Sequence, residues 1–169
     1  PPLPFLRSLL ELNVSTYVKK SDRKGVYFFS LAADKLPAVL GARIFAIPYF
    51  YAKMNNVKKD ETIHYQSQRR GNQEVIFKGS YRPISEPFFP ETGSLNHWLM
   101  ERYFLWADRE NSLYRGDIHH KPWAIQEAEV NIEKENMIPA IKREAILGDP
   151  IFHYVSSKRV LFWLPEKVR

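Results

Sequence analysis

The feature that most constrains the fold is a series of short stretches in which apolar and polar residues alternate, each bounded by turn residues. In the first, Leu12, Val14, Thr16 and Val18 fall on one face of an extended chain, as a half-buried strand requires. Strands are expected at 11–20, 26–31, 62–68, 74–81, 113–120, 125–133, 151–155 and 160–164. Many short strands with few helices between them predict a mainly β (α+β) chain, with a predominantly antiparallel barrel or sandwich in a single domain over 1–169.

Proline and capping residues predict the helices, which are expected at 36–46, 94–103 and 137–146. Pro37 suits the first turn of the first helix, because its missing N–H is not needed there. Ser94 can cap the second helix, whose apolar positions include Trp98 and Leu99 at helical spacing. These two side chains are therefore expected to be buried.

Two finer expectations concern the last part of the chain. The stretches 151–155 and 160–164 are predicted to pair with each other as a closing hairpin. The alternation before them predicts that Ala128, Val130 and Ile132 face the core.

Composition narrows the class of protein. The chain has 169 residues, of which 44% are hydrophobic, and no cysteine, so disulfides and thiolate metal sites are excluded. No apolar run approaches the length of a membrane span. The net charge of +6 comes as scattered doublets such as Lys58-Lys59 and Lys158-Arg159, which are typical of solvated turns rather than of a nucleic-acid track. We expect a cytoplasmic protein with neither nucleic acid nor a membrane as its partner.

The strand 113–120 carries the clearest candidates for chemistry. Arg115, Asp117 and His119 share one face of it, and His120 lies on the other. Asp117 could fix the tautomer of His119 and tune it as a general base near neutral pH, with Arg115 and His120 as ligand-binding groups. The alternative is a polar strand face in contact with water.

Other candidate ligand-binding residues lie on both sides of this strand in the sequence. Glu101 follows His97 by four residues, a spacing that can present two groups to a metal, but a full ligand set is missing and no metal is assigned. Trp123 could form an apolar wall for a ligand or simply pack. Tyr65 and Arg69 share a strand face and could bind a carboxylate or line solvent. No Gly-rich phosphate loop is present, and no cofactor is expected.

Five stretches of the sequence carry a resemblance to a known family. They are ELNVSTYV (11–18), GVYFFSLAADKLPAVLGARIFAIPYFYA (25–52), HYQSQR (64–69), SLNHWLMERYFL (94–105) and GDIHHKPW (116–123). They resemble an uncharacterised bacterial family of the acetoacetate-decarboxylase-like superfamily, in the expected order over nearly the whole chain. The resemblance implies a cone-shaped antiparallel β-barrel with a central cavity and a few short helices. The family normally has a further N-terminal segment, so the chain is expected to be an N-terminally incomplete barrel.

The resemblance also bears on the chemistry. Acetoacetate decarboxylases have a Gly-Arg-Glu stretch leading to Gly-Phe-Pro-Lys-Lys, whose first lysine forms the Schiff base. Tyr49 and Phe50 stand where that lysine pair would be, and without an amine no imine can act as electron sink. Decarboxylation by that route is therefore not expected. Glu11 resembles the acidic residue of the decarboxylase cavity, and Arg43 resembles the arginine of Gly-Arg-Glu.

The chain departs from the family's usual pattern at Ser15, where arginine is usual, and at Lys121, where proline is usual. Two functions stay open. One is a barrel that binds a small polar or acidic ligand in an aromatic-lined cavity without covalent chemistry. The other is an enzyme acting on small organic acids, with His119 or Tyr49 as the acid or base.

The partner expectation concerns the strand 11–20. If the barrel lacks the strands of an N-terminal segment, this strand exposes backbone N–H and C=O groups along one edge. We therefore expect a homo-oligomer, or a separate N-terminal polypeptide, to pair at that edge.

Overall fold

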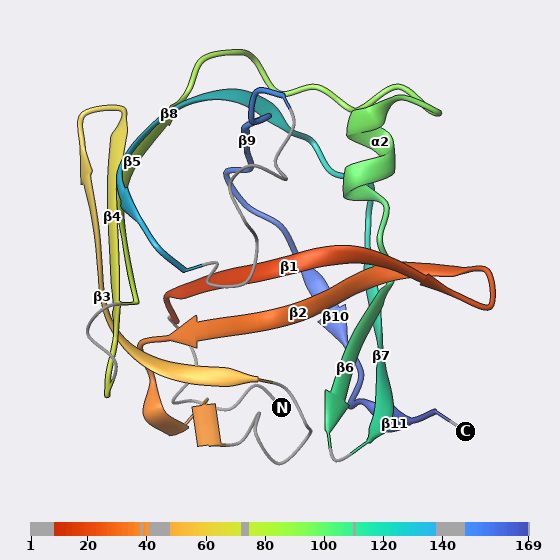
Figure 1. The fold of residues 1–169 in the computed structure, drawn as a ribbon. Helices are drawn as coiled ribbons and strands as arrows, with labels where there is room; N and C mark the ends of the chain where they lie inside the picture. Colours follow the sequence, from red (N-terminus) through yellow and green to blue (C-terminus); the bar gives the residue numbers. More distant parts are fainter. Residues whose placement is uncertain are drawn as a thin grey trace.

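The computed structural model describes residues 9–37, 39–40, 48–71, 75–109, 111–137 and 148–168. Within these residues the chain is mostly β (Figure 1). The strands are β1 (Glu11–Lys20), β2 (Arg23–Ala33), β3 (Tyr49–Lys59), β4 (Thr62–Arg69), β5 (Ile76–Pro83), β6 (Phe104–Arg109), β7 (Ser112–His120), β8 (Gln126–Glu135), β9 (His153–Tyr154), β10 (Val160–Phe162) and β11 (Glu166–Lys167). One helix, α2 (Leu95–Met100), precedes β6.

The strands form one hydrogen-bonded sheet in the order β10-β7-β6-β2-β3-β4-β5-β8-β9, with β1 on β2 and β11 on β7. In Figure 1 the long β1–β2 hairpin runs across the molecule, with β3, β4, β5 and β8 standing at one side and β6 and β7 at the other. The mainly β class and the mostly antiparallel pairing are confirmed, although β2 runs parallel to both β3 and β6. The order has two ends, so the sheet in the described residues is not closed into a barrel.

Turn geometry explains the hairpins. Ser21 and Asp22 both have positive φ angles, 47° and 64°, which gives a two-residue turn whose twist matches that of the flanking strands. Asp60 has a φ of 54° in the turn between β3 and β4. Gly25 is required for a different reason, because a Cβ there would collide with the carbonyl oxygen of Phe104 where β6 approaches β2.

The core lies where β2 meets β3 and β6. Leu31, Ala32 and Ala33 near the end of β2 are buried, as are Leu105 and Trp106 of β6. The prediction for β8 was only partly right. Its Ala128 and Val130 are half-buried, whereas Ile132 is 46% exposed and the prediction that it faces the core is wrong.

The helix predicted at 94–103 begins as expected but is shorter. The Ser94 hydroxyl accepts a hydrogen bond from the His97 backbone N–H at 3.1 Å, and the helix ends at Met100. Its predicted buried side is wrong, since the helix buries no residue and Trp98 is 42% exposed. One and a half turns on the outside of the sheet have too little surface to bury an apolar stripe.

The other two helices fall partly or wholly outside the described residues. Residues 36–37 and 39–40 are helical, as predicted. The rest of 36–46, including Arg43, and nearly all of 137–146 lie outside the described part of the chain.

The prediction that 151–155 and 160–164 pair as a closing hairpin is wrong. Instead of pairing with each other, β9 pairs with β8 through Tyr154 and Gln126, and β10 pairs with β7 through Val160 and His120. The two short strands therefore extend opposite ends of the sheet. The strand β3 was not predicted, although it pairs with both β2 and β4.

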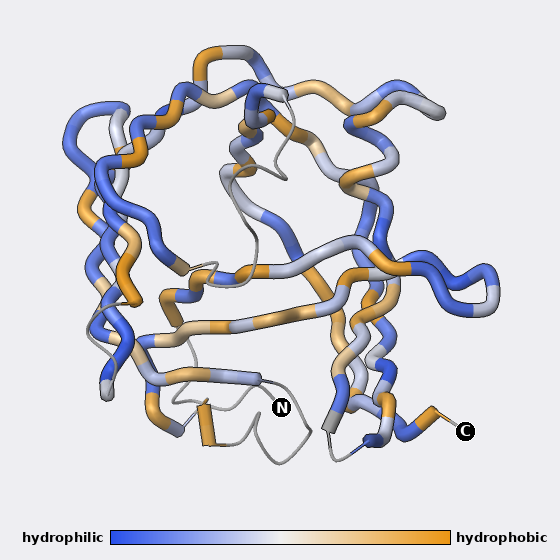
Figure 2. The backbone as a smooth tube through the Cα atoms, viewed as in Figure 1, coloured by the Kyte–Doolittle hydropathy of each residue, from blue (hydrophilic) through white to orange (hydrophobic). Residues whose placement is uncertain are grey.

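The pairing of another chain with the edge of β1 stays a prediction. Among the described residues β1 pairs with β2 alone, and the tip of the β1–β2 hairpin is hydrophilic (Figure 2). Within the same part of the chain, no helix has both the length and the apolar character needed to cross a membrane.

Candidate functional site

Three of the predicted site residues, Glu11, Tyr49 and Tyr65, come together where β1, β3 and β4 meet. We call these three and Arg69, a fourth predicted residue, the interior cluster. The Tyr49 hydroxyl donates a hydrogen bond to the Glu11 carboxylate. The Tyr65 hydroxyl donates to the Glu11 carbonyl oxygen at 2.7 Å and lies 3.7 Å from the Met54 sulfur. Tyr49 and Tyr65, which lie 38 and 54 positions after Glu11 in the sequence, thus both bind Glu11.

Arg69 completes the interior cluster from the end of β4. Its Nη2 donates to the Ser30 hydroxyl at 2.6 Å, and its guanidinium lies 3.7 Å from the centre of the Phe50 ring. Its Nε is buried without a hydrogen-bond partner among the described residues. Burial lowers the pKa of Arg69, but a guanidinium stays charged at neutral pH.

The electrostatics of the interior cluster keep its phenols protonated. Burial, and then the neighbouring Glu11 charge, raise the pKa of Tyr49 far above the usual 10.0. Burial is also the main cause that raises the pKa of Tyr65. Both hydroxyls are therefore fixed donors at neutral pH, which makes Tyr49 a poor proton donor to a substrate.

The predicted residues around α2 and β7 lie in a second region. Arg115 Nε donates to Asp117 Oδ1 at 2.8 Å, so the carboxylate that was expected to orient His119 holds Arg115. The Glu101 carboxylate accepts a hydrogen bond from the Tyr103 hydroxyl. Within the described residues no group of three or more His, Asp or Glu side chains is arranged to hold a metal ion.

His120 is buried and held on three sides. Its ring stacks on Tyr103 with centroids 4.7 Å apart. Its Nδ1 lies 2.9 Å from the Lys121 carbonyl oxygen, and its Nε2 lies 3.2 Å from the Arg102 carbonyl oxygen and 3.3 Å from Trp123 Nε1. His120 and Trp123 thus brace the end of β7.

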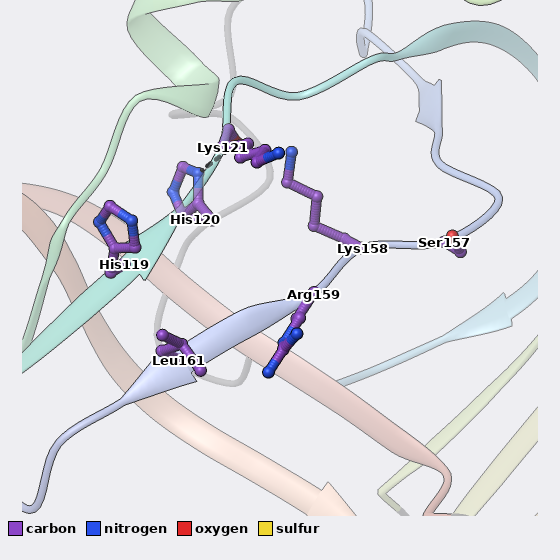
Figure 3. A pocket seen from close by; sticks show the side chains of 7 residues that line it. All are labelled: His119, His120, Lys121, Ser157, Lys158, Arg159 and Leu161. Carbon is purple, nitrogen blue, oxygen red and sulfur yellow. Dashed lines mark hydrogen bonds between the residues drawn. The ribbon is translucent and has the colours of Figure 1, made fainter.

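A pocket of about 470 Å³ opens at this end of β7, against the segment before β10 (Figure 3). We call it the basic pocket. It is lined by His119, His120, Lys121, Ser157, Lys158, Arg159 and Leu161. Figure 3 shows the amino ends of Lys121 and Lys158 pointing toward the same space from two segments of the chain. The described lining contains three cations and no carboxylate.

Lys158 is the best-positioned cation of the basic pocket. Its Nζ donates to the Pro122 carbonyl oxygen and lies 5.0 Å from the centre of the Trp123 ring. An ammonium has three N–H donors, so one contact with a carbonyl leaves donors for a ligand. The side chain is half-buried, whereas those of Lys121 and Arg159 are exposed.

The sequence predicted His119 and His120 but missed the three cations. Lys158-Arg159 was interpreted as a solvated turn, because it is one of several basic doublets scattered along the sequence. The pairing of Val160 with His120 instead brings the doublet beside Lys121. The one sequence signal for this pocket was that the segments carrying Lys121 and Lys158-Arg159 are both basic.

Comparisons with known proteins support the resemblance seen in the sequence. A family model described as an uncharacterized conserved protein, DUF2071, matches residues 1–159. The uncharacterized protein YqjF of Bacillus subtilis (strain 168) is 46% identical over 164 residues, covering 96% of this chain and 68% of the relative. The crystal structure of acetoacetate decarboxylase from Legionella pneumophila is similar with a TM-score of 0.63 and 12% identity, covering 95% of this chain and 67% of that one. At that identity the likeness shows the fold alone.

Proposed function

Because the chain belongs to the DUF2071 family of uncharacterised conserved proteins, we propose a function from its own pocket: it binds a small organic acid in the basic pocket without covalent chemistry. The single observation that carries the proposal is that Lys121, Lys158 and Arg159 line one pocket with no carboxylate among its described lining residues, and that the amino ends of Lys121 and Lys158 point toward the same space (Figure 3). Like charges that converge repel one another, and an anion bound between them removes that cost. We keep the cytoplasmic location and the cone-shaped barrel as parts of this proposal.

The size and shape of the pocket favour a small molecule. About 470 Å³ lies within the range of roughly 300–1,000 Å³ usual for small-molecule sites. Leu161 offers an apolar contact, and Ser157 offers a hydroxyl that both donates and accepts. An acid with two or three carboxylates fits the three cations better than a monoacid does.

The position of His120 supports a preformed site. Its contacts with the Lys121 carbonyl, Tyr103 and Trp123 fix the backbone from which Lys121 projects. A fixed backbone reduces the conformational entropy that the site loses on binding.

The test is a calorimetric titration with citrate and succinate at constant ionic strength, on the parent protein and on Lys158→Gln. Loss of one charge-assisted contact should weaken citrate binding about tenfold. Lys78→Gln is the matched control, since it removes a lysine that is paired with Glu133 at 2.5 Å on the sheet surface. Equal affinities for citrate in the parent and in Lys158→Gln would contradict the proposal.

A second candidate function is an enzyme acting on the same acids, with His119 as the acid or base. The observation that favours it is the place of His119 in the basic pocket. The raised pKa of Tyr49 disfavours Tyr49 in that role. His119→Gln separates the two candidates: a binder keeps its citrate affinity and has no turnover to lose, whereas an enzyme keeps binding and loses turnover.

A further inference from the structure

A second, smaller pocket of about 170 Å³ lies between the tip of the β1–β2 hairpin and α2. We call it the Arg102 pocket. It is lined by Tyr17, Val18, Lys19, Lys24, Trp98 and Arg102. It is separate from the basic pocket, and its argument does not rest on the proposed function.

Arg102 is the unusual residue of this pocket. The residue is only 8% exposed, and its Nη1 donates to the Glu101 carbonyl oxygen at 2.9 Å. Its Nη2 is buried without a hydrogen-bond partner among the described residues. A buried N–H of a charged group left without an acceptor is destabilising, so an acceptor is expected at this position.

The protein itself does not supply a carboxylate to Arg102 within the described residues. The Glu101 carboxylate is held by the Tyr103 hydroxyl. Asp22 is paired with Lys19 at 2.7 Å. Since Asp22 offsets the charge of Lys19, Arg102 and Lys24 are the lining cations that favour an anion.

Two aromatic rings form the walls. The Tyr17 and Trp98 rings lie 4.9 Å apart at an angle of 52°. The Arg102 guanidinium lies 4.0 Å from the centre of the Trp98 ring and 5.2 Å from that of Tyr17. Both rings line the pocket, so a ligand beside Arg102 also meets an apolar surface, which a bare inorganic anion cannot use.

We propose that the Arg102 pocket binds a small monocarboxylate, with its carboxylate on the Arg102 guanidinium and its short apolar body against Trp98 and Tyr17. Arginine matches a carboxylate with two parallel hydrogen bonds. A volume of about 170 Å³ is the volume that about six water molecules occupy in the liquid. The site thus takes an acid the size of butyrate rather than the larger polyacid proposed for the basic pocket.

The test follows the indole N–H signal of Trp98 by NMR while sodium butyrate is added at constant ionic strength. Trp98→Phe assigns the signal by deleting it. The expected result is a saturable shift of Trp98 with butyrate. Butyramide, which has the same size and no charge, should leave the signal unmoved. An equal response to the two compounds, or none to butyrate, overturns the proposal, and so does inorganic phosphate binding as tightly as butyrate.

Two variants locate the site. Arg102→Gln should weaken butyrate binding about tenfold or more, whereas Lys78→Gln, which removes a lysine paired with Glu133 on the sheet surface, should leave it unchanged. If Arg102→Gln does not fold, Trp98→Leu replaces it, because Trp98 is 42% exposed and its loss leaves the core intact. The amide signal of Val18 then reports binding, with a several-fold loss expected. Unchanged affinity in Trp98→Leu, or in a folded Arg102→Gln, contradicts the assignment.

Discussion

The interior cluster and the basic pocket both gather polar side chains from distant parts of the sequence, but they satisfy those groups differently. In the interior cluster Tyr49 and Tyr65 both donate to Glu11, and Arg69 donates to Ser30. The basic pocket is lined by three cations, with no carboxylate among the described lining residues. Apart from Arg69 Nε, the polar groups of the first arrangement find partners within the protein. The second is the one that we propose takes an anion.

This difference separates structure from function among the predicted site residues. Buried polar groups that satisfy one another hold strands in register. Like charges that converge on a pocket cost stability, and a ligand is a physical reason for keeping them. We therefore propose that the interior cluster contributes mainly to stability and the basic pocket mainly to binding.

The largest effect should come from removing both lysines of the basic pocket. Lys121→Gln with Lys158→Gln should weaken citrate binding about 50- to 100-fold, since two charge-assisted contacts are lost. Thermal unfolding should occur at the same temperature or slightly higher, because repulsion between the two ammonium groups is relieved. A large loss of stability in this double variant would break the comparison, since the lysines would then be structural.

The interior cluster should respond in the opposite way. Tyr49→Phe removes a donor from the half-buried Glu11 carboxylate and should cost about 1.5–3 kcal/mol of unfolding free energy, measured by urea denaturation. Citrate affinity should not change. Tyr27→Phe is the matched control, because Tyr27 donates to Asp108 in the same kind of pair at an exposed position. It should cost no more than about 1 kcal/mol.

The pH dependence of stability sharpens the same contrast. The pKa of Tyr49 is raised above the usual 10.0 in the folded protein, so above pH 10 the unfolded chain loses this proton before the folded protein does. Stability should therefore fall as the pH rises above 10. In Tyr49→Phe that fall should be shallower, and the stability gap between the two proteins should narrow. Parallel curves above pH 10 would mean that Tyr49 is not buried against Glu11.

The sequence predicted the interior cluster better than the basic pocket, for a physical reason. The alternation of 62–68 put Tyr65 and Arg69 on one strand face, and the resemblance to the decarboxylases singled out Glu11. The contact between Tyr49 and Glu11 could not be predicted, because it requires β3 to lie beside β2. Most of the second half of β3 is exposed on both faces, and such a strand shows no alternation.

The basic pocket depends on a pairing between strands that are far apart in the sequence. The stretches 151–155 and 160–164 have the local signals of a hairpin, and local signals cannot exclude a more favourable partner elsewhere in the sheet. Once Val160 pairs with His120, the place of Lys158 follows. The position of Arg102 beneath Trp98 was likewise hidden, because the helix ends two residues before Arg102 rather than continuing through it.

The last prediction is that imine trapping has no effect on the protein. Borohydride trapping with acetoacetate should leave the mass of the protein unchanged, because the sequence resemblance places Tyr49 and Phe50 where decarboxylases have their lysine pair. A reduced adduct on Lys53, or on Lys121 or Lys158, would show that a lysine of this chain forms an imine. An adduct in the basic pocket would change the account from binding to covalent catalysis.

The most direct test of the central claim is a crystal structure of the protein grown with citrate. The account predicts density for citrate in the basic pocket, with carboxylate oxygens within hydrogen-bond distance of Lys158 Nζ and of Lys121 Nζ or the Arg159 guanidinium. The same crystals of Lys158→Gln should show that density weakened or lost. Citrate bound at the interior cluster, or a basic pocket that holds only water at a saturating citrate concentration, would contradict the claim.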